Sequence, residues 1–458
     1  MNAEATKISG TSYSPSNGSQ SNSLAEYAHR LLSLALGEGA DEAEVFGMEG
    51  RSAEVDLRKD KVEMASQSIH WGLGLRAVVS GAVGFSSTSD MTKLNLVARS
   101  AVKSALARGS DPQWRSFPAP QSGPMLQDIF DQKLDQAGPE ECLDLAASML
   151  DGCLEVKGAE PVSGGVTCVS KTKFIINSQG LDASEKSTYL QASMETIARS
   201  SDVATGNEFH NSRMFEPNLK SVGKAAAEMA ASSIDGTKVG SGTFDVILKP
   251  LAFVELLEYA FVPSISADNV LKGRSHLSTR LGEQIGSDCL CMNDDGLLAG
   301  GMGTSAFDDE GVGSQKTVVI QNGVLKGFLY DSYNAGKAGL KSTGNAVRGG
   351  YAEVPLVGLR NLVVSSDESL DLQSETKGLL VNSFIGAHTA NPISGDFSVE
   401  ARNSFYIEPK EAPRPITSMM LAGNVFDLLR DIDMGRDARI VGGIVTPSVR
   451  VKMKVVGS

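Results

Sequence analysis

Apolar residues recur at helical spacing near the N-terminus and then alternate with polar ones. The first periodic stretch predicts a helix that Ser23 caps and Gly37 ends. Over residues 42–89, apolar and polar residues alternate in short runs separated by glycines, as in antiparallel strands with one exposed face. Helical spacing returns over 91–109. We therefore expect a helix–sheet–helix unit over residues 23–110.

A proline-rich stretch separates this unit from the rest of the chain. Residues 111–125 contain four prolines and no periodicity, which predicts a linker. Residues 126–235 again read as helix, strands and helix. From 241 to 458 short strands bounded by glycines dominate, and Asn322-Gly323 supplies the two central residues of a type I′ hairpin turn.

These patterns predict an α+β fold. We expect two small N-terminal helix/antiparallel-sheet units followed by a large, mainly antiparallel β domain at the C-terminus. Composition agrees, because 48 of the 458 residues are Gly, which suits many tight turns, and 41% are hydrophobic, which suffices for a large core. Residues 1–22 are rich in Ser, Asn, Gly and Thr, which predicts a disordered tail.

Charge and cysteine content narrow the expected partners and compartment. The chain has 42 Lys and Arg against 55 Asp and Glu, and this net charge of −13 disfavours nucleic acid as a partner. No stretch approaches 18 apolar residues, so we expect no membrane span, and the N-terminus lacks the apolar segment of a secretory signal. Five cysteines, an odd number in a large chain, indicate reduced thiols and a cytoplasmic location.

Three motifs identify a family resemblance. They are GLGLRAVVSGAVGFSSTS at 72–89, a long stretch at 307–346 that begins FDDEGVGSQKTVVIQNG, and HTANPISGDFSVEARNSFYIE at 388–408. Together they resemble the TldD/PmbA (TldE) family, formerly called modulators of DNA gyrase. The resemblance covers nearly the whole chain after residue 23.

The resemblance implies one of two functional types. TldD-type members resemble metallopeptidases with a helical His-Glu-x-x-x-His element and a further Cys ligand near the C-terminus. PmbA-type (TldE) members look like partners that lack the metal. The resemblance further implies a heterodimer of the two types that degrades small unfolded peptides and trims peptide precursors.

The expected metal positions carry no metal ligands in this sequence. The helix expected after the strand FDVILKP is LAFVELLEYAFVPS, which contains no histidine, and Glu255 and Glu258 read as a solvated helix edge. Met434 stands where the family resemblance places the Cys ligand, and a thioether is a poor ligand for zinc. We therefore expect no metal or other cofactor in this chain and a zinc ion in a TldD-type partner.

Two segments carry the candidate site residues. His388 lies on a glycine-broken loop with Asn391, Ser394 and Asp396, and such a loop can bind metal, perform acid–base chemistry or hold itself together. Ser394 with His388 and Asp396 could also form a nucleophilic trio, although triad members usually come from distant segments. We expect no catalytic residue here. We expect the following residues to line a peptide site or a subunit interface: His388, Asn391, Asp396, Asp308, Asp309 and Glu310.

Two further patterns suggest metal binding only weakly. Cys289 and Cys291 are two residues apart, a spacing that suits one strand face better than a structural zinc site. The acidic run 308–310 could bind calcium loosely but lacks the alternating ligand spacing of a calcium loop. We interpret the cysteines as buried strand residues and the acidic run as a positioning loop.

The sequence thus favours a metal-free, PmbA/TldE-type subunit of a peptidase complex and leaves open whether the chain is itself an enzyme. One alternative is a self-sufficient homodimeric metallopeptidase with non-standard ligands. The other is a non-proteolytic interaction protein of the gyrase-modulator type. We expect the partners to be a TldD-type chain or a second copy of this chain, and small unfolded peptides.

Overall fold

The computed structural model describes residues 23–121, 123–124 and 126–456. The predicted tail at 1–22 lies outside the described residues. Helices and mainly antiparallel sheets build the chain, so the predicted α+β class is confirmed. Within the described part of the chain, no helix is long and apolar enough to cross a membrane.

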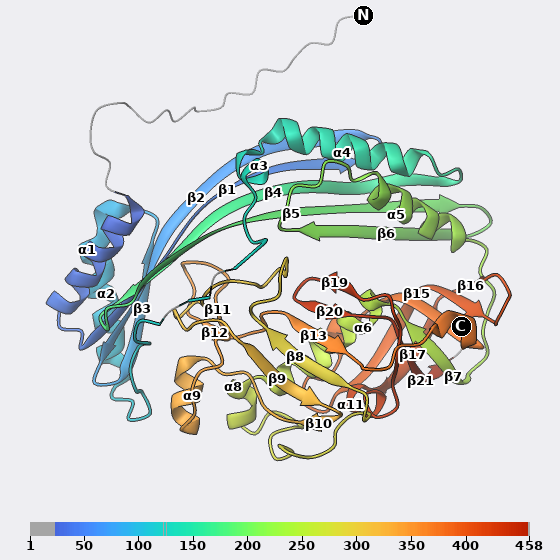
Figure 1. Ribbon diagram of the computed structural model, residues 1–458. Coiled ribbons are helices and arrows are strands. Elements are labelled where there is room, and N and C mark those ends of the chain that lie inside the picture. The colour runs from blue at the N-terminus through green and yellow to red at the C-terminus, as the bar shows by residue number, and fades with distance from the viewer. Residues whose placement is uncertain (1–22, 122, 125, 457–458) are drawn as a thin grey trace, which may run out of the picture.

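A long curved sheet forms the N-terminal half (Figure 1). It is entirely antiparallel and has six strands in the order β3-β2-β1-β4-β5-β6. The central strands reach 17 to 19 residues, far beyond the usual five or six. The strands are β1 (Glu42–Arg58), β2 (Lys61–Val79), β3 (Ala82–Thr88), β4 (Ala159–Asn177), β5 (Asp182–Arg199) and β6 (Val203–Ser212).

The sheet joins the two N-terminal units that the sequence suggested. β1 pairs with β2 from its own unit and with β4 from the next one, along nearly its whole length. The strands of both units therefore share one continuous sheet. Local periodicity could not predict this, because pairing of β1 with β4 depends on residues more than 100 positions apart.

Helices cover one face of this sheet in two pairs. Alternate residues of β1, including Ala43, Val45, Ala53 and Val55, are buried beneath them. Ser23 caps the first helix, as predicted, by accepting the N–H of Glu26. The helices are α1 (Leu24–Gly37) and α2 (Leu94–Arg108) at one end, α4 (Pro139–Leu154) and α5 (Lys220–Ser232) at the other, with a 3₁₀ turn at Met91–Lys93 and the short α3 (Gln132–Gln136).

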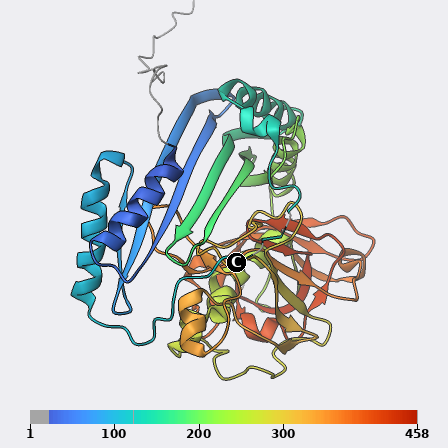
Figure 2. The same ribbon diagram turned by 60° about the vertical axis from the view of Figure 1, so that its left-hand side comes forward.

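The opposite face of the sheet looks toward the C-terminal domain (Figure 2). The other set of β1 residues, Glu44, Phe46 and Met48, contacts that domain or lines pockets beside it. The segment 111–121 runs along the sheet rather than standing free. Phe117 is buried in this segment, and its backbone N–H donates to Glu42 at 3.1 Å.

The C-terminal domain is built on a seven-stranded sheet and a six-stranded sheet. In the first sheet β14 pairs with both β7 and β15, which closes five strands into a ring around an apolar core. Most pairs are antiparallel, and β14–β7 is parallel. The strands are β7 (Gly242–Leu248), β14 (Gly378–Ile385), β15 (Asp396–Ile407), β16 (Arg414–Ile416), β17 (Met419–Asn424), β18 (Asp433–Met434) and β21 (Val449–Val456).

The six-stranded sheet contains the predicted hairpin. Asn322 and Gly323 have φ of 50° and 72°, as a type I′ turn requires. The strands are β8 (Cys291–Asp295), β9 (Lys316–Gln321), β10 (Val324–Leu325), β13 (Leu362–Ser365), β19 (Arg439–Val441) and β20 (Ile444–Thr446); β11 (Ala346–Val347) and β12 (Leu356–Val357) pair separately. The domain's helices are α6 (Pro250–Leu256), a π-helical turn (Leu257–Phe261), α7 (Val262–Ile265), α8 (Ala267–Leu271), α9 (Ser332–Ala338), α10 (Leu372–Glu375) and α11 (Val425–Leu428).

Candidate functional site

The loop between β14 and β15 brings His388 to a pocket. Gly386 has φ of 87°, a left-handed conformation that glycine adopts without strain, and a 3₁₀ turn at Ala387–Thr389 follows it. This turn leaves His388 exposed at the wall of a pocket of about 570 Å³. The predicted lining position of His388 thus coincides with a pocket, while its role stays a prediction.

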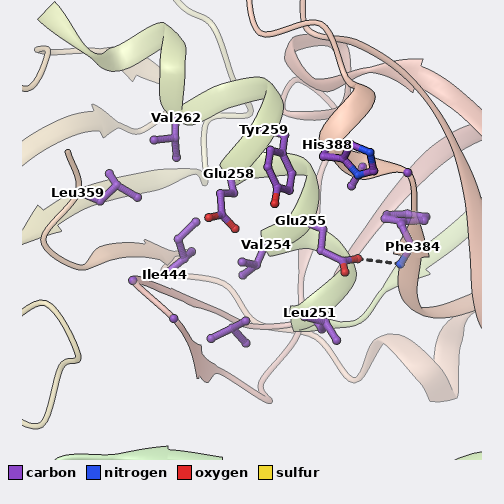
Figure 3. A pocket seen from close by; sticks show the side chains of 15 residues that line it. Leu251, Val254, Glu255, Glu258, Tyr259, Val262, Leu359, Phe384, His388 and Ile444 are labelled. Carbon is purple, nitrogen blue, oxygen red and sulfur yellow. Dashed lines mark hydrogen bonds between the residues drawn. The ribbon is translucent and has the colours of Figure 1, made fainter. Parts of the chain in front are cut away.

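Helix α6 and the π-helical turn form the facing wall of this pocket (Figure 3). They contribute Glu255, Glu258 and Tyr259. The rings of Tyr259 and His388 meet edge-on, with centroids 6.4 Å apart. The hairpin between β19 and β20, residues 441–444, closes another side. Apolar side chains thus surround two carboxyl groups, one phenol and one imidazole.

Glu255 is the most perturbed group in the pocket. It is half-buried, and its Oε2 accepts the backbone N–H of Phe384 on β14 at 2.7 Å. Burial raises the pKa of Glu255 to about 7, although the N–H of Phe384 and the charge of Arg402 oppose the rise. The prediction of a solvated helix edge is therefore wrong for Glu255, whereas Glu258 is exposed as that prediction requires. The residues next to Glu255 on the helix are apolar, and this pattern could have predicted its partial burial.

The donor atoms of this pocket do not fit a catalytic zinc. Such a site takes about three protein ligands, usually with imidazole or thiolate among them, plus an open position. Here one histidine on the loop faces two carboxyl groups, of which Glu255 has a raised pKa and Glu258 is exposed, and the helix carries no imidazole. Throughout the described ranges, no group of three or more His, Cys, Asp or Glu side chains is placed to hold a metal ion. Met434 is buried in β18.

Asn391 and Asp396 hold the loop itself together. Asn391 Oδ1 accepts the backbone N–H groups of Ile393 and Ser394 at 2.9 and 3.1 Å. Asp396 accepts the Ser394 hydroxyl at 2.6 Å and the Asn424 amide at 2.8 Å. These two hydrogen bonds lower the pKa of Asp396. Both residues are exposed, and their predicted lining or interface role stays a prediction.

His388 does not complete a nucleophilic trio in this loop. Ser394 donates to Asp396, and across the described chain no side-chain hydrogen bond involves His388. A general base must lie within hydrogen-bond reach of the nucleophile it activates. The local arrangement therefore gives no support to Ser–His–Asp chemistry.

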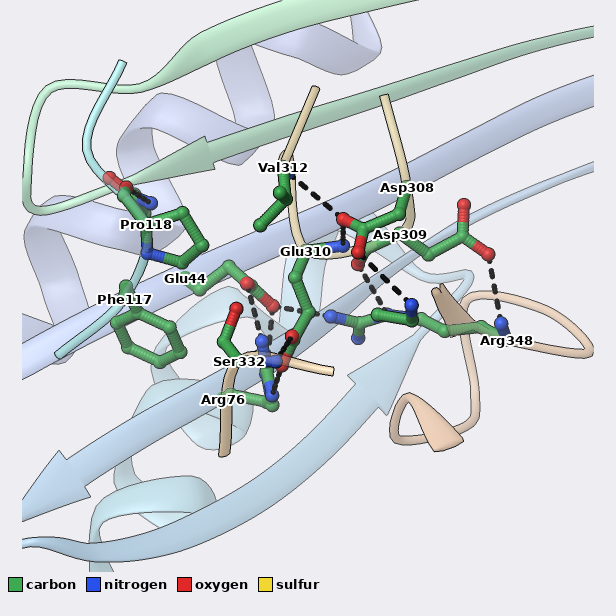
Figure 4. A network of polar contacts seen from close by, with 12 residues as sticks. Glu44, Arg76, Phe117, Pro118, Asp308, Asp309, Glu310, Val312, Ser332 and Arg348 are labelled. Atoms are coloured by element: carbon green, nitrogen blue, oxygen red, sulfur yellow. Dashed lines mark hydrogen bonds and ion pairs between the residues drawn. The ribbon is translucent and has the colours of Figure 1, made fainter. Parts of the chain in front are cut away.

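The acidic run 308–310 lies in the contact between the long sheet and the C-terminal domain (Figure 4). Glu310 accepts from Arg76 of β2 at 2.8 Å, and Asp309 accepts from Lys173 of β4 at 2.9 Å. Asp308 instead accepts three backbone N–H groups of the domain, from Glu310, Val312 and Ala346. All three carboxylates are buried in this contact, and Asp309 also lines a small cavity there. Their predicted lining or interface role stays a prediction.

Two arginines complete this buried network. Arg76 pairs with Glu44 at 2.6 Å as well as with Glu310, and Arg348 also pairs with Glu44. Burial and the charge of Glu310 raise the pKa of Asp308 to about 7. Burial opposes ionisation of Glu310, but Arg76 outweighs it and lowers the pKa of Glu310. The ion pairs therefore connect β1 and β2 with the loops that carry residues 307–348.

Cys289 and Cys291, one of the two weak metal patterns, are not arranged as ligands of a shared metal ion. Cys291 begins β8, whereas Cys289 precedes the strand, and both are half-buried rather than fully buried strand residues. Cys291 Sγ lies 3.4 Å from Asn322 Oδ1, and Cys289 Sγ lies 3.8 Å from the carbonyl of Ile432. The two thiols thus have separate surroundings.

Comparisons with known proteins match three stretches of this chain. Three family profiles match, described as PmbA/TldA metallopeptidase domain 1, central domain and C-terminal domain; they span residues 43–105, 132–234 and 241–457. An uncharacterised protein of Methanocaldococcus jannaschii is 31% identical over 93% of this chain and 99% of its own length. Metalloprotease PmbA of Escherichia coli O157:H7 is 26% identical over 95% of this chain and 96% of its own.

Solved structures of similar proteins match nearly the whole chain as well. A crystal structure from Thermotoga maritima, described as a modulator of a DNA gyrase, has a TM-score of 0.87 and 26% identity, and the match covers 94% of this chain and 100% of that one. The TldE structure from Thermococcus kodakarensis has a TM-score of 0.86 and 24% identity over 94% and 100%, which shows the shared fold. The chain belongs to the PmbA/TldD family, whose named relatives are metalloproteases.

Proposed function

We propose that this chain is the metal-free, PmbA/TldE-type subunit of a TldD/TldE-like metallopeptidase complex that degrades or trims small unfolded peptides. One observation carries the proposal: the helix that lines the pocket presents two glutamates and no histidine, and the residue at the C-terminal ligand position is the buried Met434. A TldD-type partner supplies the zinc, its bound water and the catalytic base.

The pocket fits a binding role better than a catalytic one. Its apolar walls and few polar groups are typical of ligand sites. β19 is an edge strand of its sheet, and the hairpin that follows it lines the pocket. An extended peptide can pair with an exposed strand edge through backbone hydrogen bonds. A peptide held there lies beside Glu255 and His388 without needing either as a metal ligand.

A reconstitution assay tests this proposal. An unfolded peptide is incubated with this chain, with a TldD-type chain, and with an equal mixture of both. We expect hydrolysis by the mixture and none by this chain alone. Replacing His388 by Ala in this chain should weaken binding of the peptide to the mixture, seen as a higher KM, because His388 lies at the pocket wall.

Each alternative function has a distinct outcome in the same assay. Hydrolysis by this chain alone, abolished by a chelator, would favour the self-sufficient homodimeric peptidase and contradict the proposal. Absence of hydrolysis from every sample, despite formation of a stable heterodimer, would favour a non-proteolytic interaction protein.

A further inference from the structure

A second, smaller cavity lies between the inner face of the long sheet and the C-terminal domain. Its volume is about 190 Å³, well below the roughly 300–1,000 Å³ of sites for larger ligands. β4 and β5 contribute Lys171, Lys173 and Tyr189, and loops of the C-terminal domain contribute Arg348 and Arg360. Leu359 lines both this cavity and the pocket at Glu255 and His388, so the two spaces adjoin.

Positive charge exceeds negative charge around this cavity. The lining holds four cationic side chains and two carboxylates, Glu185 and Asp309. Lys173 is matched by Asp309 at 2.9 Å, and Arg348 is matched by Glu44 behind the wall. Of the lining residues, this leaves two cations, Lys171 and Arg360, and one carboxylate, Glu185. Glu185 already accepts the backbone N–H of Ala306 at 2.5 Å.

Among the described residues, the guanidinium of Arg360 contacts no carboxylate directly, although its charge lowers the pKa of Asp309 and opposes the rise in the pKa of Asp294. The residue is 6% exposed, and its Nε is buried with no hydrogen-bond partner. Across the described chain no ion pair or hydrogen bond of the Arg360 side chain is formed; its backbone N–H donates to Asp294 at 2.9 Å. An unpaired buried charge is unfavourable, and proteins normally pair such groups. The guanidinium therefore has free donors beside an enclosed space.

Two cationic side chains lie close to the ring of Tyr189, which lines the same cavity. Lys171 Nζ lies 4.6 Å from the centre of its ring, and the guanidinium carbon of Arg213 lies 4.1 Å from it. Arg213 is buried and donates to the carbonyls of Gly301, Met302 and Thr304 rather than to a carboxylate. Burial opposes ionisation of Tyr189, yet Lys171 and Arg213 outweigh it and lower the pKa of the phenol.

We propose that this cavity binds one oxyanion group through Arg360 and Lys171, and that its carrier is the C-terminal carboxylate of a peptide. The planar fork of an arginine matches the two oxygens of a carboxylate, and a nearby lysine adds charge without fixed geometry. The choice of a peptide as carrier rests on the proposed function and on the shared wall at Leu359. The small volume admits a terminal residue rather than a long segment.

A binding titration tests this site independently of hydrolysis. A fluorescent, unfolded pentapeptide is prepared with a free C-terminal carboxylate and, separately, with a C-terminal amide. Each is titrated with the full chain alone and with the chain mixed with its TldD-type partner. We expect the acid to bind about tenfold or more tightly than the amide, because a charge-assisted bidentate contact is lost in the amide.

Variants assign this preference to the cavity. Arg360→Gln should remove the preference for the acid while leaving amide binding unchanged, and Arg360→Lys should retain part of it. A thermal melt shows whether Arg360→Gln is folded. If it is not, Lys171→Gln replaces it, because Lys171 is only half-buried and its loss should also remove the preference for the acid. Lys61→Gln is the matched control, since Lys61 is exposed at the start of β2 and far from the lining.

Two outcomes would overturn the site, a third would overturn the peptide as its ligand, and a fourth separates the site from the proposed function. Equal binding of acid and amide would contradict an oxyanion contact, and a preference that survives in both Arg360→Gln and Lys171→Gln would place it elsewhere. Inorganic phosphate that binds in an Arg360-dependent manner, without any preference among the peptides, would assign the cavity to a free anion. Loss of hydrolysis by the mixture together with intact acid preference would overturn the proposed function and leave the site standing.

Discussion

At the scale of single residues, the side chains of the candidate site take their partners from distant parts of the chain. His388 and Asp396 lie on an exposed glycine-broken loop, as its composition indicates. The surroundings of Glu255 were not predictable, because the N–H that its carboxyl accepts belongs to Phe384, 129 residues away. The partners of the acidic run 308–310 were not predictable for the same reason, since Arg76 and Lys173 lie more than 130 positions from it.

Glu255 makes stability depend on pH in a specific direction. Its pKa in the folded chain is about 7 against 4.5 as the ordinary value, so the folded state holds the proton more tightly. Stability from this group is present at low pH and is lost as pH rises from about 4.5 through 7. Glu255→Gln keeps a hydrogen-bond acceptor for the N–H of Phe384 but cannot ionise. The free energy of unfolding of this variant, relative to that of the wild type, should therefore be about 1 kcal/mol higher at pH 8 than at pH 5.5.

Denaturant unfolding at the two pH values measures this change. Glu258→Gln is the matched control, because Glu258 is exposed on the next turn of the same helix. A constant difference between Glu255→Gln and the wild type at both pH values would contradict the buried, protonated Glu255.

Loss of Arg348 should destabilise the chain strongly. Its guanidinium is fully buried against Glu44, and without it Glu44 and Glu310 share Arg76 alone, which leaves one buried negative charge uncompensated. Arg348→Met should lower the free energy of unfolding by about 3–5 kcal/mol. Arg58→Met, which breaks the exposed pair with Glu63, should cost less than about 1 kcal/mol. Equal losses in the two variants, measured by urea unfolding, would show that the network contributes little.

At the scale of elements, periodicity predicts which segments are helices and strands but not which strands meet. The helix over 94–108 and the Asn322-Gly323 hairpin follow from local pattern alone. The π-helical turn at Leu257–Phe261 does not, since its residues are equally suited to an α-helix. The pairing of β1 with β4 likewise needs the whole sheet, because both strands alternate and could pair with many others.

Close packing of helices on the sheet depends on glycines that face backbone. A Cβ at Gly84 of β3 would lie 2.0 Å from the carbonyl oxygen of Ala101 in α2. Gly84→Ala should therefore push α2 off the sheet and lower the unfolding free energy by about 1–3 kcal/mol. Gly37→Ala is the control, since nothing lies within 4 Å of the added carbon. A thermal melt that shows equal midpoints for Gly84→Ala and wild type would contradict this packing.

At the scale of the whole molecule, the long sheet lies over the C-terminal domain and buried ion pairs hold the two together. Two adjoining cavities result from this arrangement. The one at Glu255 and His388 lies in the C-terminal domain, and the one at Arg360 lies between that domain and the long sheet. The hydrophobic and glycine patterns predicted the α+β class and the mainly antiparallel C-terminal domain, and both are confirmed. They could not predict the small cavity, because its lining comes from six separate segments of the chain.

The metal content of the purified chain tests the central claim most directly. This chain and a TldD-type partner are purified in parallel from cells grown with zinc, and each is assayed by elemental analysis. The pocket offers one imidazole and two carboxyl groups, and one of these, Glu255, holds its proton near neutral pH. We therefore predict far less than one zinc per chain here and about one in the partner. About one tightly bound zinc in this chain, lost on replacing Glu255 or His388, would contradict the account.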